Sequence, residues 1–225
     1  MTTCPVPTAP VTIILVSWNT RDLLRGALAS VRAHAGLPVQ VVVVDNASSD
    51  DSVAMVRSEF PEVTLIANPD NRGFGQANNQ GIAAGTQPFI LLLNSDAELT
   101  PGALPALLED MVRHPEAGAV GARLVFPDGR PQESFSRFPT LWRYALELGG
   151  FSSFARDFSQ RRASQRRVGE ASEVEWVVGA AVLIRREALA TVQGTKGFDP
   201  DFHMYSEEMD LCRRIHDARW SIRHA

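Results

Sequence analysis

Short apolar runs that end abruptly in polar residues recur along the first half of the chain. The clearest is 89–93, five apolar residues followed at once by Asn94, Ser95 and Asp96. An unbroken apolar run of this length, bounded by turn residues, is typical of a strand covered on both faces in a parallel sheet. Similar runs occupy 11–16, 39–44 and 63–67. The pattern therefore predicts four buried strands in this half.

Segments with helical spacing separate these strands. Between Leu23 and Val31 apolar residues recur three or four positions apart, after Thr20, a residue type that often begins helices. Further helices are predicted at 52–60, in the later part of 68–81 and around 103–113. Strands that alternate with helices in this way form parallel sheets with right-handed crossovers. The expected fold is α/β, a mostly parallel central sheet flanked by helices.

The regular alternation ends after a predicted strand at 119–126 and a turn at 127–129. A short helix is predicted near 141–148. The basic stretch near 152–170 follows, and its part 156–167 holds five arginines and one aspartate. This segment is either a solvated loop or a basic lid that covers a phosphorylated substrate or contacts an anionic membrane surface.

Order is expected to return at 175–184, an apolar strand with Gly179 in its middle, and at a helix over 186–192. A glycine inside a strand marks either the close approach of a ligand or a packing need. A last helix begins with Glu207, Glu208 and Asp210, and its predicted apolar face is Met209, Leu211 and Ile215. Acidic residues in a first turn can simply complement the helix dipole, although three carboxyls in four residues exceed that need.

Composition and charge narrow the class of protein. The chain has 225 residues, 44% of them hydrophobic, which is enough for a substantial core. A formal net charge of −4 gives no support to nucleic acid as a partner. The two cysteines, Cys4 and Cys212, form no disulfide framework, which fits a reducing compartment. Residues 1–10 are a Pro-rich lead with neither signal-peptide nor membrane-span character, and we expect this lead to be flexible.

Polar residues follow three of the predicted parallel strands, at 17–19, 45–49 and 94–96. Because the carboxyl ends of parallel strands open onto one crevice, these groups should gather there, with Asp96 at its mouth. A carboxylate beside an amide and a hydroxyl can hold a hard divalent cation that bridges two phosphates. The alternative is that Asp96 only caps the helix that begins near Pro101.

Several other chemistries do not fit. The segment GFGQANNQG has Asn78 in place of the third glycine of a dinucleotide fingerprint and follows the third strand, not the first. No G-x-S-x-G nucleophile elbow and no zinc-ligand spacing occur. Acidic residues follow the second and fourth strands and lie on a late helix. Such residues can hydrogen-bond a nucleobase, hold a metal ion on a diphosphate and act as a general base. These are the needs of group transfer from a nucleotide-activated donor.

Five motifs taken in order resemble the family 2 inverting glycosyltransferases of the GT-A fold, in particular their rhamnosyltransferase-like branch. They lie at 13–19, 44–48, 71–78, 92–96 and 207–212. The resemblance covers nearly the whole of 11–220. It implies that Ser17 and Asn19 line the nucleotide pocket and that Asp45 faces the pyrimidine base of the donor.

The resemblance also assigns roles to the other motifs. Donor ribose and diphosphate would be bordered by Arg72, Gly73 and Asn78 and contacted by Asn94 and Ser95. Asp96 would bind Mg²⁺ or Mn²⁺ as the last residue of the D-x-D element, whose first Asp is replaced here by Asn94. Trp176 and Gly179 would face the acceptor sugar. The pair Glu207 and Glu208 would supply the base, and the resemblance leaves open which of the two it is.

The expected activity is the metal-assisted transfer, with inversion, of a sugar from a nucleotide-diphosphate donor to a glycan or lipid-linked acceptor. One domain is expected over 11–225, with a nucleotide-sugar-binding half at 11–126 and an acceptor-binding half at 127–225. By the same resemblance, family members carry a metal-binding His beyond the last residue of this chain. His224 falls too early in the sequence to be that His, so we expect a C-terminal truncation that impairs metal binding and activity. The expected location is the cytoplasm, at the inner face of the membrane. Two alternatives are a non-catalytic sugar-nucleotide-binding module and a sugar-1-phosphate nucleotidyltransferase, although no Gly-rich basic loop follows the first strand.

Overall fold

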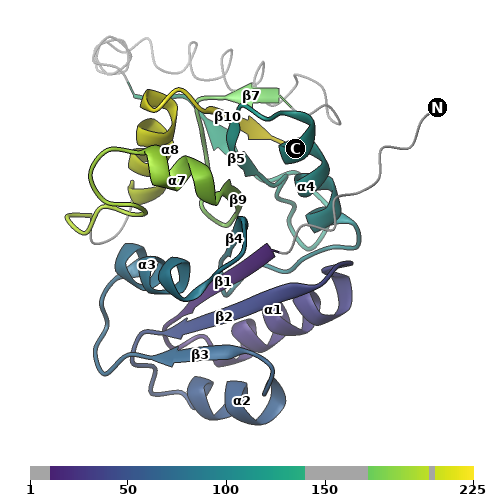
Figure 1. The fold of residues 1–225 in the computed structure, drawn as a ribbon. Coiled ribbons are helices and arrows are strands. Elements are labelled where there is room, and N and C mark those ends of the chain that lie inside the picture. The colour runs from purple at the N-terminus through teal and green to yellow at the C-terminus, as the bar shows by residue number, and fades with distance from the viewer. Residues whose placement is uncertain (1–10, 140–171, 203–205) are drawn as a thin grey trace, which may run out of the picture.

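The computed structural model describes residues 11–139, 172–202 and 206–225. An eight-stranded sheet with the order β3-β2-β1-β4-β9-β5-β10-β7 runs through its centre (Figure 1). Its strands are β1 (Val11–Ser17), β2 (Val39–Asp45), β3 (Thr64–Ala67), β4 (Phe89–Leu93), β5 (Ala117–Gly121), β7 (Ser172–Val174), β9 (Ala181–Arg185) and β10 (Ser221–His224). A separate pair joins β6 (Phe135–Ser136) to β8 (Trp176–Val177).

The first half has the alternation that the apolar pattern predicts. Strands β2 and β4 pair with β1 on its two sides, β3 pairs with β2, and all of these pairings are parallel. The connecting helices are α1 (Arg21–His34), α2 (Ser52–Glu59) and α3 (Phe74–Ala84), and α4 (Ala103–Arg113) follows β4. The predicted α/β class and mostly parallel sheet are therefore confirmed.

The sheet separates two apolar cores because neighbouring strand residues point to opposite faces. Ile13 and Leu15 of β1 pack on one face with α1, α2 and α4, whereas Ile14 packs on the other with α3 and α8 (Glu207–Asp217). Helix α7 (Arg186–Thr191) also covers this second face (Figure 1). Gly81 lets α3 approach the sheet closely, since a Cβ there would lie 2.4 Å from Cγ2 of Ile14.

The prediction of one strand over 175–184 is wrong. Residues Trp176–Val177 pair with β6 outside the main sheet, and the chain then turns at 178–180 before it enters β9. Strand β9 lies antiparallel between β4 and β5. A continuous apolar run predicts that a segment is buried. It does not predict where the chain leaves one sheet and enters another.

Three smaller expectations also need correction. Strand β5 ends at Gly121, not at 126, because the chain then enters a turn in which the backbone N–H of Phe126 donates to the carbonyl of Arg130 at 2.8 Å. Strand β10 was not predicted. On α8 the buried apolar positions are Leu211, Cys212 and Ile215, while Met209 is only partly buried.

Some sequence predictions lie outside the described residues. These are the flexible lead at 1–10, the helix near 141–148, and the basic segment 156–167 with its membrane contact. Within the described ranges, no helix has the length and apolarity that are required to cross a bilayer.

Candidate active site

The strand order places a crevice beside β1. The chain winds from β1 outward to β2 and β3 and then returns to β4 on the other side of β1. In open α/β sheets, ligands bind at such a reversal, beyond the carboxyl ends of the strands. The loop after β1 and the loop after β4 flank this point, and they carry the predicted groups Ser17, Asn19 and 94–96.

The loop after β1 is tied to the loop after β2. The backbone N–H of Asn19 donates to Oγ of Ser48 at 2.9 Å, and Oδ1 of Asn19 accepts from the backbone N–H of Ser49 at 2.8 Å. Asn19 holds a positive φ of 56°, which an Asn tolerates better than most residues. Its side-chain oxygen thus fixes the relation of two loops, and its Nδ2 makes no hydrogen bond within the described ranges.

Asp45 ends β2 and is 1% exposed. Its Oδ1 accepts a hydrogen bond from the backbone N–H of Ser48 at 2.9 Å. Its Oδ2 is buried and finds no hydrogen-bond partner among the residues that the structure describes. A buried acceptor without a partner costs roughly 1–3 kcal/mol, so this oxygen favours a ligand N–H that would satisfy it.

Buried amides hold the loop before α3. Nδ2 of Asn46 donates to the carbonyl of Gly73 at 3.2 Å, and Oδ1 of Asn46 accepts from Asn68 at 2.9 Å. Asn68 and Gln80 exchange two further hydrogen bonds at 2.8 and 3.0 Å. Gly73 begins α3 with a φ of 79°, a conformation that favours glycine.

Arg72, beside Gly73, is exposed. Its Nε lies 3.8 Å from Oδ1 of Asp70, and its guanidinium is accessible to an anion.

Asn78 does not face the crevice as a free donor group. It is 2% exposed, and its Nδ2 donates to the carbonyl of Phe74 in its own helix at 3.0 Å. Its neighbour Asn79 makes the longer connection. Both ends of the Asn79 amide bond the backbone of Phe198, with Nδ2 donating at 2.7 Å and Oδ1 accepting at 2.8 Å.

The loop after β4 leans on the loop after β1. Oγ1 of Thr20 donates to Oγ of Ser95 at 3.1 Å and is 3.0 Å from Oγ of Ser17. Asp96 itself is exposed. The alternative role of Asp96 as a helix cap is wrong, because α4 begins with Gly102 in the N-cap position.

Asp96 offers one exposed carboxylate, a ligand type that divalent cations accept. Among the described residues, no three His, Cys, Asp or Glu side chains cluster as a metal cage. Mg²⁺ commonly binds through one or two carboxylates together with substrate phosphates and water, and an exposed Asp96 meets that requirement.

Glu208 reaches the same edge of the sheet from the other side. The backbone N–H of Asn94 donates to the carbonyl of Ala180 at 2.9 Å, which joins the loop after β4 to the turn before β9. In that turn, a Cβ on Gly179 would lie 3.4 Å from Cβ of Glu208. Glu208 is therefore a direct neighbour of this turn, beside the loop after β4.

Glu207 has a different environment from its neighbour. It is 5% exposed, and its Oε2 is buried without a hydrogen-bond partner in the described part of the chain. Burial raises the pKa of this carboxyl, and the charge of Glu208 raises the pKa further. Glu207 is thus the more deeply buried of the two carboxyls, whereas Glu208 is only partly buried.

Trp176 lies in β8, where the indole N–H donates to the carbonyl of Arg137 at 3.0 Å. His224 ends β10 with its ring 4.6 Å from the ring of Phe135, and burial lowers its pKa.

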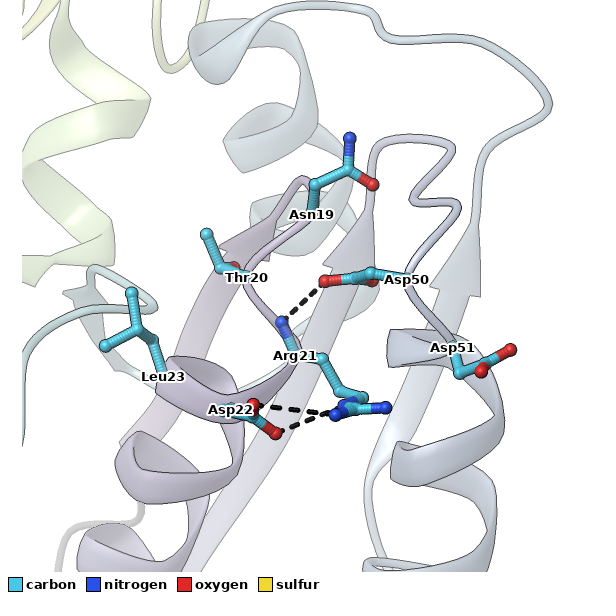
Figure 2. Close-up of a pocket in the computed structure, with 7 residues that line it drawn as sticks. All are labelled: Asn19, Thr20, Arg21, Asp22, Leu23, Asp50 and Asp51. Carbon is cyan, nitrogen blue, oxygen red and sulfur yellow. Dashed lines mark hydrogen bonds and ion pairs between the residues drawn. The ribbon is translucent and has the colours of Figure 1, made fainter.

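An open depression of about 410 Å³ borders the loop after β1 on the side of α2. Figure 2 shows Asp50 facing the backbone nitrogen of Arg21, while the guanidinium of Arg21 turns to Asp22. The remaining residues that line the depression are Asn19, Thr20, Leu23 and Asp51. Three carboxylates repel phosphate, so the depression suits uncharged hydrogen-bonding groups better than a diphosphate.

The structure thus brings most of the predicted site residues to one edge of the sheet. A continuous series of contacts leads from Asp45 to Glu208 through Ser17, Thr20, Ser95, Asn94, Ala180 and Gly179. Sequence reasoning missed Thr20 as a bridge and Asn46, Asn68 and Asn79 as anchors of loops. The clustering of Asn and Gln over 68–80 was a signal for such anchors, although it does not name their partners.

Several known proteins are similar in sequence to this chain. The family profile described as "Glycosyl transferase family 2" matches residues 12–192. The N-acetylglucosaminyl-diphospho-decaprenol L-rhamnosyltransferase of Mycobacterium tuberculosis is 31% identical over 226 aligned positions, which cover 92% of this chain and 71% of that protein. The succinoglycan biosynthesis protein ExoO of Rhizobium meliloti is 37% identical over 134 positions, 56% of this chain and 37% of ExoO.

Solved structures show the same fold. The mannosyltransferase PcManGT from Pyrobaculum calidifontis, in complex with GDP-Man and Mn²⁺, superposes with a TM-score of 0.65 at 21% identity, over 94% of this chain and 53% of that one. TarS of S. aureus, residues 1–349, gives 0.63 at 15% identity, over 96% of this chain and 60% of that one. The chain therefore spans little more than half the length of these two proteins. Together with the matching profile and the similarity to a rhamnosyltransferase, this fold confirms the predicted resemblance: the chain belongs to glycosyl transferase family 2.

Proposed function

We propose that this chain transfers a sugar from a nucleoside-diphosphate donor to a hydroxyl of a glycan or lipid-linked acceptor, with inversion. The observation that carries the proposal is the series of contacts that joins Asp45, Ser95 and Glu208 along one edge of the sheet. One ligand at that edge can meet a group for its base, a group for its diphosphate and a general base. Membership of a glycosyltransferase family supports this function over a nucleotidyltransferase.

The donor is held by groups of differing charge. The unpartnered Oδ2 of Asp45 accepts an N–H of the nucleobase, which relieves its buried, unsatisfied state. Arg72 and the hydroxyl of Ser95 border the diphosphate, and Asp96 provides the carboxylate for Mg²⁺ or Mn²⁺. When bound, this cation neutralises charge that develops on the departing diphosphate.

Glu208 is the general base in this proposal. The acceptor hydroxyl gives its proton to the carboxylate of Glu208 while its oxygen attacks the anomeric carbon. The bond from that carbon to the diphosphate breaks on the opposite side, so configuration inverts and the nucleoside diphosphate leaves. Glu208 suits the task better than Glu207, because Glu207 is only 5% exposed whereas Glu208 is partly accessible to an acceptor hydroxyl. Trp176 and Gly179 border the acceptor side.

The place of action follows from the substrates. The rhamnosyltransferase relative carries a lipid-linked acceptor in its name, N-acetylglucosaminyl-diphospho-decaprenol. By analogy, we propose a cytoplasmic protein that meets a lipid-linked acceptor at the inner face of the membrane, with the basic segment 156–167 as the contact.

The test is release of nucleoside diphosphate from a panel of nucleotide sugars with Mn²⁺, in the presence and absence of lipid-linked and glycan acceptors. Glu208→Gln should leave donor affinity within about twofold and reduce turnover by roughly 10²–10⁴, the usual contribution of a general base. Glu187→Gln on the exposed side of α7 makes the same chemical change and should keep full turnover.

Two results would contradict the proposal. Tight binding of a nucleotide sugar without any release of nucleoside diphosphate would indicate the non-catalytic binding module instead. Retained turnover in Glu208→Gln would move the base to another residue.

A further inference from the structure

Thr20 stands where a threonine usually caps a helix, yet its side chain makes no capping hydrogen bond. The N-terminus of α1 is served by Asp50, whose Oδ2 accepts from the backbone N–H of Arg21 at 2.8 Å. The hydroxyl of Thr20 is therefore free for another purpose. Its contacts lie on the two loops that flank the crevice, Ser17 at the end of β1 and Ser95 after β4.

The direction of these bonds follows from the chemistry of a hydroxyl, which has one proton to donate and two lone pairs to accept. The hydroxyl of Thr20 donates its one proton to Oγ of Ser95. In the contact with Ser17 it must therefore accept, and Ser17 donates. Ser95 accepts from Thr20, and its own proton meets no acceptor within the described ranges. The series therefore ends in one free O–H donor, next to Asp96.

The hydroxyl series strengthens the Ser95 O–H as a donor, and a charged acceptor would form the stronger bond with it. Ser17 is 1% exposed, so the series begins in the interior and leads outward to the crevice. Each hydroxyl in such a series polarises the next, which makes the terminal O–H a better donor. Hydrogen bonds to charged acceptors such as phosphate oxygens are the stronger class.

We propose that Thr20 is a positioning residue that fixes the rotamer of Ser95 so that the Ser95 hydroxyl donates to a phosphate oxygen of a bound nucleoside diphosphate. This inference rests on the proposed donor-binding function and adds a residue to it. Thr20 acts through Ser95 and makes no contact with the diphosphate.

The experiment measures calorimetric affinities for UDP, GDP and dTDP with Mn²⁺, using the full chain and the diphosphate that binds the wild type best. Thr20→Val keeps the side-chain shape and removes the hydroxyl, and α1 keeps its cap because Asp50 supplies it. We expect affinity to fall about tenfold, as the loss of one hydrogen bond to a charged group implies. Thr20→Ser restores the hydroxyl and should recover most of the affinity.

Two further variants separate positioning from general damage. Ser95→Ala should weaken binding as much as Thr20→Val, and the double variant should be no weaker than Ser95→Ala alone, because both changes act on the same Ser95–phosphate hydrogen bond. Thr12→Val makes the same change on β1 at the other end of the strand, where Oγ1 of Thr12 donates to Gln40. It should keep wild-type affinity, whatever its effect on thermal stability.

The outcomes are distinct. Wild-type affinity in Thr20→Val, or losses that multiply in the double variant, would overturn the positioning role and leave the donor-binding function standing. Failure of all three diphosphates to bind the wild type would overturn the donor-binding function and the positioning role with it.

Discussion

At the residue scale, the adjacent carboxyls Glu207 and Glu208 lie one position apart on α8 but differ in their exposure to solvent. Glu207 is 5% exposed, while Glu208 lies along Gly179 and is partly buried. Burial costs an ionised carboxylate its hydration, so the pKa of Glu207 is raised above its ordinary value. The two neighbours therefore differ in their access to water, and burial acts on the pKa of Glu207.

This difference predicts a pH-dependent stability. A carboxyl with a raised pKa in the folded state stabilises the fold fully below its unfolded pKa, and this contribution is lost as pH rises through the folded pKa. Glu207→Gln, which cannot ionise, should therefore gain stability relative to the wild type as pH rises from about 4.5 to 8. Urea unfolding midpoints at a series of pH values measure this gain. A difference that stays constant across the series would mean that Glu207 ionises freely in the fold.

At the scale of elements, the contact of α3 with β1 depends on Gly81. Glycine weakens a helix interior by roughly 1 kcal/mol relative to alanine, so Gly81→Ala would be stabilising on helix propensity alone. The added Cβ would lie 2.4 Å from Cγ2 of Ile14, however, and overpacking of a core costs about 1–3 kcal/mol. We expect a net loss of stability in thermal unfolding.

The partner residue provides the control for this prediction. Ile14→Ala removes Cγ2, the atom on which the new methyl group would press. The double variant should be more stable than the sum of the two single changes predicts, because the residues are in contact. Strictly additive effects would show that α3 shifts outward to accommodate the methyl group.

Elements also show how far sequence patterns go. The four parallel strands and their helices follow from the apolar runs, and so does the gathering of polar groups beyond β1, β2 and β4. The split of 175–184 between two sheets and the antiparallel direction of β9 do not, because burial constrains neither a strand's partner nor its direction. The hydrogen bond from Thr20 to Ser95 could not be predicted for a similar reason. It joins residues 75 positions apart, and the sequence does not show which of the many hydroxyl groups is its partner.

At the scale of the whole molecule, one ion pair joins strand β10 to helix α4 across the sheet–helix interface. The guanidinium of Arg223 on β10 binds both carboxylate oxygens of Asp110 on α4, at 2.8 and 3.1 Å. Asp110 is 8% exposed, and the side chain of Arg223 is 11% exposed. A pair so shielded from water leaves a costly charge behind when either partner is removed.

Asp110→Ala should accordingly destabilise the protein by about 3–5 kcal/mol, the usual result of leaving one buried charge without its partner. Arg223→Met keeps the length of the side chain without its charge. Combined with Asp110→Ala, it should recover part of the loss, since neither charge remains. Denaturant unfolding of the single and double variants checks this, and a double variant less stable than Asp110→Ala would contradict the argument.

The central place of β9 has a consequence for synthesis on the ribosome. Strand β4 is complete at Leu93, but the strand that covers its outer edge begins only at Ala181. A nascent chain therefore carries the hydrogen-bonding edge of PFILLL unprotected while many further residues are translated, and such edges recruit other strands. Chaperones that shield this segment during that interval would protect newly made protein from aggregation.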